Sequence, residues 1–131
     1  MVTEDYVSLK TAKLLKERGF DENCAALYHL RTGEIIQQGV GYVFNNSQWE
    51  NFVSAPTLQM AMKWLREVHH YYIQVMLDSW ALGDHSGYYV VVQKTDSDFE
   101  MMLSDTKERV FYGTPEDAAE DAIMYIVENL I

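Results

Sequence analysis

The sequence predicts an α+β protein built from three helices and one antiparallel sheet of about four to five strands. Three segments repeat apolar residues at helical spacing next to capping residues, and several shorter segments alternate or are dense in β-branched and aromatic residues. Short turns separate most of the expected strands, which is typical of an antiparallel sheet with one covered face. The expected order of elements is αββαβββα.

The first helix is expected to begin after Ser8, whose hydroxyl can accept a hydrogen bond from the first turn. Val7 precedes this cap and is placed to pack against Ala12. Gly19 is expected to end the helix, because glycine readily adopts the left-handed conformation that follows many helices. The apolar face of this helix consists of Leu9, Ala12, Leu14 and Leu15.

The second helix is expected to follow Pro56, with Thr57 as its N-cap. His69 and His70 are expected to close it, where a partly protonated imidazole suits the negative end of the helix dipole. The pattern predicts a buried side made of Leu58, Ala61, Leu65 and Val68, and an opposite side made of Lys63, Arg66 and Glu67.

The third helix has the clearest local pattern in the chain. Thr114 is the expected N-cap, Pro115 suits the first helical position, and Asp117 completes a capping box. The predicted buried face consists of Ala118, Ala119, Ala122, Ile123, Ile126 and Leu130. The acidic residues Glu116, Asp117, Glu120, Asp121 and Glu128 are expected to form a solvated face.

Two strands are expected between the first two helices, over 26–31 and 34–44, joined at Thr32 and Gly33. Gly39 and Gly41 predict a bulge or bend in the second of them. The sequence therefore predicts a hairpin in this part of the chain.

Three more strands are expected between the last two helices. Alternation over 73–78 predicts the first, the Tyr and Val residues of 88–95 predict a deeply buried second, and 109–112 predicts a short third. A turn is expected over 83–87, and the stretch 96–108 fits either a loop or an extra strand pair.

Composition limits the function. The 131 residues contain 48% apolar residues, enough for one globular domain over 1–131. Ten Lys and Arg against 20 Asp and Glu give a net charge of −10, which argues against direct binding to nucleic acid or to an anionic membrane. The acidic N-terminus and the absence of a long apolar run predict neither a signal peptide nor a membrane span. With Cys24 as its single cysteine, the chain is expected to be cytoplasmic.

Candidate chemical residues are few, and each has a structural interpretation. His69 and His70 are adjacent and cannot easily share one metal ion, and His85 lies in a glycine-flanked turn. Cys24 and His29 form a possible thiolate and base, although nothing completes a triad and a buried structural thiol is the favoured interpretation. No catalytic residue, metal or cofactor is therefore expected.

Acidic and aromatic clusters remain as candidates for binding. Asp96, Asp98, Glu100 and Asp105 lack the spacing of a calcium loop. The acidic face of the third helix could imitate nucleic-acid phosphates. The aromatic residues around the second helix exceed what one buried face can hide, so some are expected to contact a partner: Trp49, Phe52, Trp64, Tyr71, Tyr72 and Trp80.

Three segments also resemble a known family. LLKERGFDENC at 14–24, SAPTLQMAMKWLREVHH at 54–70 and TPEDAAEDAIMYIVENLI at 114–131 are similar to small proteins that recur in gut Bacteroidetes genomes, their prophages and mobile elements. That family has no assigned activity, so the resemblance implies a phage-like context and no catalytic residue. Members often have Pro where Asn23 stands here.

The leading hypothesis is a non-enzymatic interaction protein that binds a protein partner or itself. A surface helix needs no particular cation at Arg66, so the patch of Arg66, Glu67 and His69 is the first candidate for binding, together with Tyr72 and Trp80 on the aromatic face. Two alternatives stay open: an acidic decoy of a host nucleic-acid-binding protein, and an enzyme that acts on a small molecule.

Overall fold

The computed structural model describes residues 2–37, 44–46, 50–82, 85–103 and 111–131, with the backbone alone described at 79–82 and 85–86. Its helices are α1 (Leu9–Glu17), α2 (Leu58–His69) and α3 (Pro115–Asn129). The strands are β1 (Ala26–His29), β2 (Ile35–Gln37), β3 (Phe52–Ser54), β4 (Tyr71–Leu82), β5 (His85–Lys94) and β6 (Glu100–Met102).

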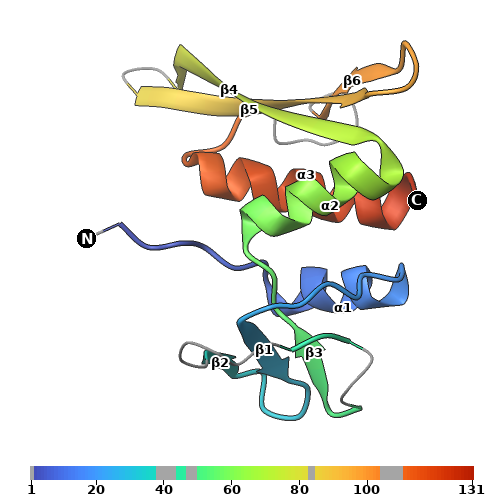
Figure 1. The fold of residues 1–131 in the computed structure, drawn as a ribbon. Helices are drawn as coiled ribbons and strands as arrows, with labels where there is room; N and C mark the ends of the chain where they lie inside the picture. The colour runs from blue at the N-terminus through green and yellow to red at the C-terminus, as the bar shows by residue number, and fades with distance from the viewer. Residues whose placement is uncertain (1, 38–43, 47–49, 83–84, 104–110) are drawn as a thin grey trace.

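The α+β class and the three helices are confirmed, but the expectation of a single sheet of four to five strands is wrong. The described strands form two antiparallel sheets of three strands each, in the orders β2-β1-β3 and β4-β5-β6. Figure 1 shows the larger sheet lying over α2 and α3, with α1 between these helices and the smaller sheet. The helices therefore separate the two sheets.

The smaller sheet, β2-β1-β3, contains a strand that the sequence pattern did not predict. β3 has only three residues, too few to show a period of two, yet it pairs with β1 on the side opposite β2. With β3 in place, β1 has a neighbour on each side and needs no strand from the second half of the chain. The observed order is therefore αβββαβββα, with one strand more than expected.

Strand boundaries also differ from the prediction. β4 begins at Tyr71 and continues to Leu82, and β5 begins at His85, inside the turn expected over 83–87. The last strand of the larger sheet is β6, which lies in the stretch left open as a loop or strand pair. Of the strand expected over 109–112, Tyr112 forms an isolated bridge with Tyr88, and residues 109 and 110 lie outside the described ranges.

In the first hairpin, the second strand is much shorter than the predicted 34–44. β2 ends at Gln37, and the bend expected at Gly39 and Gly41 lies outside the described residues. Phe44 is described again and forms an isolated antiparallel bridge with Cys24.

All three helix caps are confirmed. The Ser8, Thr57 and Thr114 side chains each accept a hydrogen bond from the backbone N–H three residues later. Gly19 follows α1 with φ of +90°, and the residue after α2, His70, has φ of 64°. These positive φ values end the helices by turning the chain away from the helix axis.

The core lies between the helices and the larger sheet and extends to the smaller sheet, where Phe20, Cys24 and Val53 are buried. Val68 was expected in the core but is 51% exposed, because it lies in the last turn of α2, where the chain reverses, while Trp64 is buried. The central strand β5 contributes Val90 and Val92, both buried. The fully buried residues of the helices include Ala12, Leu15, Ala61, Leu65, Ala122, Ile123, Ile126 and Val127.

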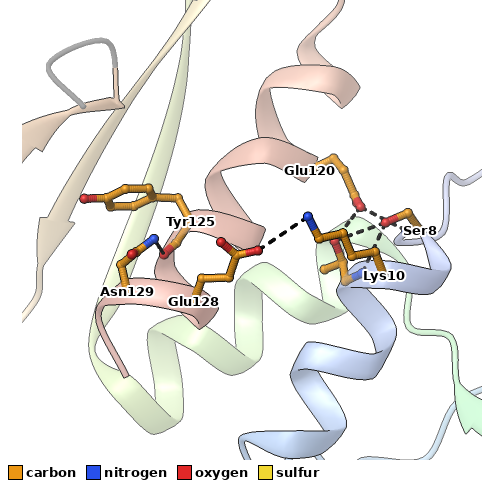
Figure 2. A network of polar contacts seen from close by, with 7 residues as sticks. Ser8, Lys10, Glu120, Tyr125, Glu128 and Asn129 are labelled. Carbon is orange, nitrogen blue, oxygen red and sulfur yellow. Dashed lines mark hydrogen bonds and ion pairs between the residues drawn. The ribbon is translucent and has the colours of Figure 1, made fainter. Parts of the chain in front are cut away.

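The acidic side of α3 is not simply a solvated face, which corrects that expectation. Glu120 Oε1 accepts hydrogen bonds from the Ser8 N–H at 3.0 Å and from Thr11 Oγ1 at 2.7 Å. Figure 2 shows this contact beside the longer ion pair between Lys10 and Glu128, 3.8 Å apart. The Tyr112 hydroxyl likewise donates to Asp121. Three of the five expected surface acids therefore contact other parts of the fold, Glu120 and Asp121 through hydrogen bonds and Glu128 through a long ion pair.

Candidate functional site

β4 forms one edge of the larger sheet. It pairs with β5 through Ile73 opposite Val92 and Val75 opposite Val90. Among the strands that the structure describes, none pairs with the other side of β4. The side chains of Ile73 and Val75 pack against the core, whereas Tyr72 and Met76, on the opposite face of the strand, are 41% and 39% exposed.

The hydrogen bonds of β5 reveal which backbone groups of β4 point outward. Tyr88 exchanges backbone hydrogen bonds of 2.9 and 2.8 Å with Tyr112, so its N–H and C=O point away from β4. Leu77 lies opposite Tyr88, which makes this pair the non-hydrogen-bonded kind and directs the Leu77 N–H and C=O away from β5. The period of two extends this direction to Val75 and Ile73.

The start of β4 gives the same assignment of inward and outward backbone groups. The Thr95 N–H donates to the His70 C=O at 2.8 Å, so His70 directs its carbonyl toward β5. Tyr72 and Gln74 share that direction because they lie two and four residues further along. Ile73, Val75 and Leu77 thus present three N–H and three C=O groups on the open edge.

α2 lies beside this edge and forms one wall of a groove of about 570 Å³. The opposite wall comes from β4 through Tyr72, Ile73 and Val75. The residues of α2 and its cap that line the groove are Thr57, Gln59, Met60, Met62, Lys63 and Arg66. An extended segment laid along β4 would therefore have backbone groups on one side and a helix with apolar and cationic side chains below it.

Lys63 and Arg66 give this groove two positive charges in a chain of net charge −10. They are three residues apart on α2 and hence share one face of the helix. Arg66 Nη2 lies 3.8 Å from Glu67 Oε1, but both side chains are largely exposed and such a pair is weak. Lys63 makes no ion pair with any residue in the described ranges. Both cations are accessible to an acidic ligand.

The structure brings together only part of the site predicted from the sequence. Arg66 and Tyr72 line the same groove, and Glu67 lies next to Arg66 but lines a separate depression beside Trp64. The side chain of Trp80 lies outside the described residues, so its place on the aromatic face stays a prediction.

His69 lies apart from the groove. Its ring packs edge-on against Trp64 at 4.7 Å between centroids, and its Nε2 is buried without a hydrogen-bond partner among the described residues. Burial, and secondarily the neighbouring His70, lowers the pKa of His69 below its usual value of 6.5. His69 is the last residue of α2, as expected, but this lowered pKa disfavours the partly protonated imidazole that was expected at the end of the helix.

Sequence reasoning missed the most informative groups of the groove. The pattern placed Lys63 on the side of α2 opposite its buried face, where it lies, but did not single it out, and it could not show which backbone groups of Ile73 and Val75 point outward. One signal was available: β4 follows α2 after the single residue His70, so the start of the strand lies next to the end of the helix.

The catalytic alternatives find little support in the geometry. Burial, and then Glu22, raises the pKa of Cys24 to about 12, so its thiol is protonated at neutral pH. His29 is occupied elsewhere: its Nδ1 accepts the Arg31 N–H at 3.1 Å and its ring packs on Phe52. The proposed pair of Cys24 and His29 is therefore not formed.

The part of the chain that the structure describes contains neither a group of metal-binding side chains nor a membrane-spanning helix. No three His, Cys, Asp or Glu side chains there are grouped so that they could hold a metal ion. No helix there combines the length and the apolar character that a membrane crossing requires. The side chain of His85 lies outside the described residues.

Comparison with protein-family models, curated proteins and solved structures finds no match to this chain. The resemblance to small Bacteroidetes and prophage proteins therefore stays a prediction.

Proposed function

We propose that this chain is a protein-interaction module that binds an extended segment of a partner protein as an additional strand on β4. The observation that carries the proposal is the row of outward N–H and C=O groups at Ile73, Val75 and Leu77, next to the groove formed by α2. In this mode of recognition, backbone hydrogen bonds supply affinity and neighbouring side chains supply specificity.

The composition of β4 supports the proposal. Edge strands that must stay unpaired are usually short or interrupted by Lys, Pro or a bulge. β4 has 12 residues, and its first seven, YYIQVML at 71–77, contain no charged residue and no proline. The irregularity in its pairing with β5 begins only after Asp78. The stretch beside α2 thus lacks the features that normally prevent strand addition.

The two alternative functions receive weaker support. An acidic decoy would need the carboxylates of α3 on its surface, but Glu120 and Asp121 accept hydrogen bonds from within the fold. An enzyme using Cys24 would need a thiolate, and burial favours the thiol. Strand addition at the groove beside β4 requires neither the release of a hydrogen bond within the fold nor the deprotonation of a side chain.

The proposal is tested by removing one outward N–H. Val75→Pro deletes the donor at the centre of the groove without removing a bond to β5, and Val75→Ala is its matched control because it truncates the same side chain but keeps the N–H. The probe is a fluorescent, end-blocked peptide, Ser-Val-Gln-Val-Gln-Val-Ser, followed by fluorescence anisotropy.

We expect Val75→Ala to bind this peptide within a few-fold of the parent and Val75→Pro to lose binding at least tenfold. Thermal unfolding establishes that both variants are folded. Should Val75→Pro not fold, Leu77→Pro takes its place, since Leu77 is 56% exposed and has the same outward N–H. Equal binding by the proline and alanine variants, or no peptide binding by the parent at millimolar concentration, would overturn the proposal.

A further inference from the structure

We infer that the segment bound on β4 carries carboxylate side chains two residues apart, alternating with apolar side chains. This inference rests on the proposed strand addition and adds the chemistry of the partner. It follows from the two different surfaces that an added strand would meet on its two faces.

The face of the added strand directed toward α2 would meet the two cations of the groove. Lys63 and Arg66 are three residues apart and therefore separated by about 4.5 Å along the helix axis. Side chains on one face of an extended strand repeat about every 6.6 Å. The flexible stems of Lys and Arg span the difference of about 2 Å, so successive carboxylates on this face can each reach one cation.

The opposite face of the added strand would lie next to an apolar surface. Tyr72 and Met76 are the exposed neighbours on that face of β4, at 41% and 39% exposure. Cross-strand neighbours of this kind favour apolar or aromatic partners. The preferred segment is thus apolar, acidic, apolar, acidic, apolar.

Charge also favours a different protein over a second copy of this chain. Antiparallel pairing of two β4 edges about a two-fold axis would place two α2 helices face to face across the new pair of strands. Lys63 and Arg66 of one copy would then oppose the same residues of the other, in addition to the repulsion between two chains of net charge −10. An acidic segment from a different protein would instead place negative charge next to Lys63 and Arg66, so the repulsion between the cations of two copies would not arise.

The test compares three end-blocked peptides, Ser-Val-X-Val-X-Val-Ser, in which both X residues are Glu, Gln or Lys. Fluorescence anisotropy at low and high salt gives their affinities. We expect the Glu peptide to bind about tenfold more tightly than the Gln peptide at low salt, and the Lys peptide to bind most weakly. High salt should reduce the preference for Glu, because the groove is open to solvent.

The double variant Lys63→Gln/Arg66→Gln should lose the preference for Glu and keep its affinity for the Gln peptide. Lys13→Gln/Arg31→Gln is the matched control, because it also removes one Lys and one Arg, both exposed and outside the groove. It should leave the order of the three peptides unchanged. This control separates a local effect of the groove from the change in net charge.

The outcomes distinguish the inference from the proposed function. Equal binding of the Glu and Gln peptides, both weakened by Val75→Pro, would overturn the acidic preference and leave strand addition standing. Tighter binding of the Lys peptide would also overturn it. If sedimentation shows a dimer that Val75→Pro dissociates, the occupant of the edge is a second copy and the inference is wrong. If none of the peptides binds, both proposals fail.

Discussion

The smaller sheet ends on both sides in strands of three residues, whereas the larger sheet ends on one side in β4, which has 12. Short edge strands offer few unpaired backbone groups to another chain. Both sheets pair antiparallel and both have three described strands, so strand number and direction do not distinguish them. The length of the open edge does.

The surroundings of the two edges also differ: β3 is packed against its neighbours, whereas β4 borders a groove. β3 is followed by the buried Ala55 and packs near α1, with Val53 only 1% exposed. β4 instead has α2 beside it at a distance that leaves a groove. A helix can therefore cover a sheet face and still leave the edge of that sheet available.

The strongest test of this comparison contrasts the centre of the larger sheet with its edge. Val92 of β5 is fully buried, and Val92→Ala is expected to cost about 2 kcal/mol of unfolding free energy through lost burial and a residual cavity. Leu77→Ala on β4 removes more atoms but should cost less than about 0.5 kcal/mol, because Leu77 is 56% exposed. Urea unfolding measures both. A cost at Leu77 equal to that at Val92 would mean that the edge is covered in solution.

A second test addresses the hydrogen bonds by which Glu120 of α3 joins the start of α1. Glu120→Ala removes the acceptor of the Ser8 N–H and of the Thr11 hydroxyl, and should cost about 1–3 kcal/mol. Glu128→Ala is the control on the same helix, because among the described residues Glu128 makes only a long, exposed ion pair with Lys10 (Figure 2). Equal stability of the two variants would show that the contact of α3 with the start of α1 contributes nothing.

The dependence of stability on alkaline pH probes the region of Cys24, next to the smaller sheet. The backbone of Cys24 forms an isolated β-bridge with that of Phe44. In the folded state the pKa of the Cys24 thiol is about 12, against an ordinary value of 9.0. The folded state therefore holds this proton more tightly, and the stability present below pH 9 should be lost progressively as pH rises toward 12. Cys24→Ala should lessen that decline in urea unfolding. Rapid alkylation of native Cys24 by iodoacetamide near pH 8 would contradict its burial.

The helix ends could be predicted because their chemistry is local. Ser8, Thr57 and Thr114 each cap a helix through a contact three residues away, and Gly19 ends α1 by its own conformational freedom. Such contacts depend only on neighbouring residues. The same reasoning placed α2 correctly and therefore placed Arg66 on its exposed side.

The division into two sheets could not be predicted in this way. It depends on which strands pair, and the decisive strand, β3, is too short to show a pattern. The groove depends on pairing as well, because the direction of the Val75 N–H follows from the register between β4 and β5. Arg66 and Tyr72 were predicted as site residues from charge and aromatic character, whereas the outward backbone groups of Ile73 required the pairing, and Lys63 became a candidate only because α2 and β4 line one groove.

The smallest expected effect concerns Glu67, the acidic neighbour of the groove. Its ion pair with Arg66 spans 3.8 Å between exposed side chains, so Glu67→Gln should change the unfolding free energy by less than about 0.5 kcal/mol. The same variant releases Arg66 from a competing carboxylate, and binding of the Glu peptide should tighten by about two- to threefold while that of the Gln peptide stays constant. Anisotropy titrations at low salt measure the change. Weaker binding of the Glu peptide would mean that Glu67 orients Arg66 toward the groove, so that the edge of the larger sheet would depend on a positioned cation as well as on its open backbone.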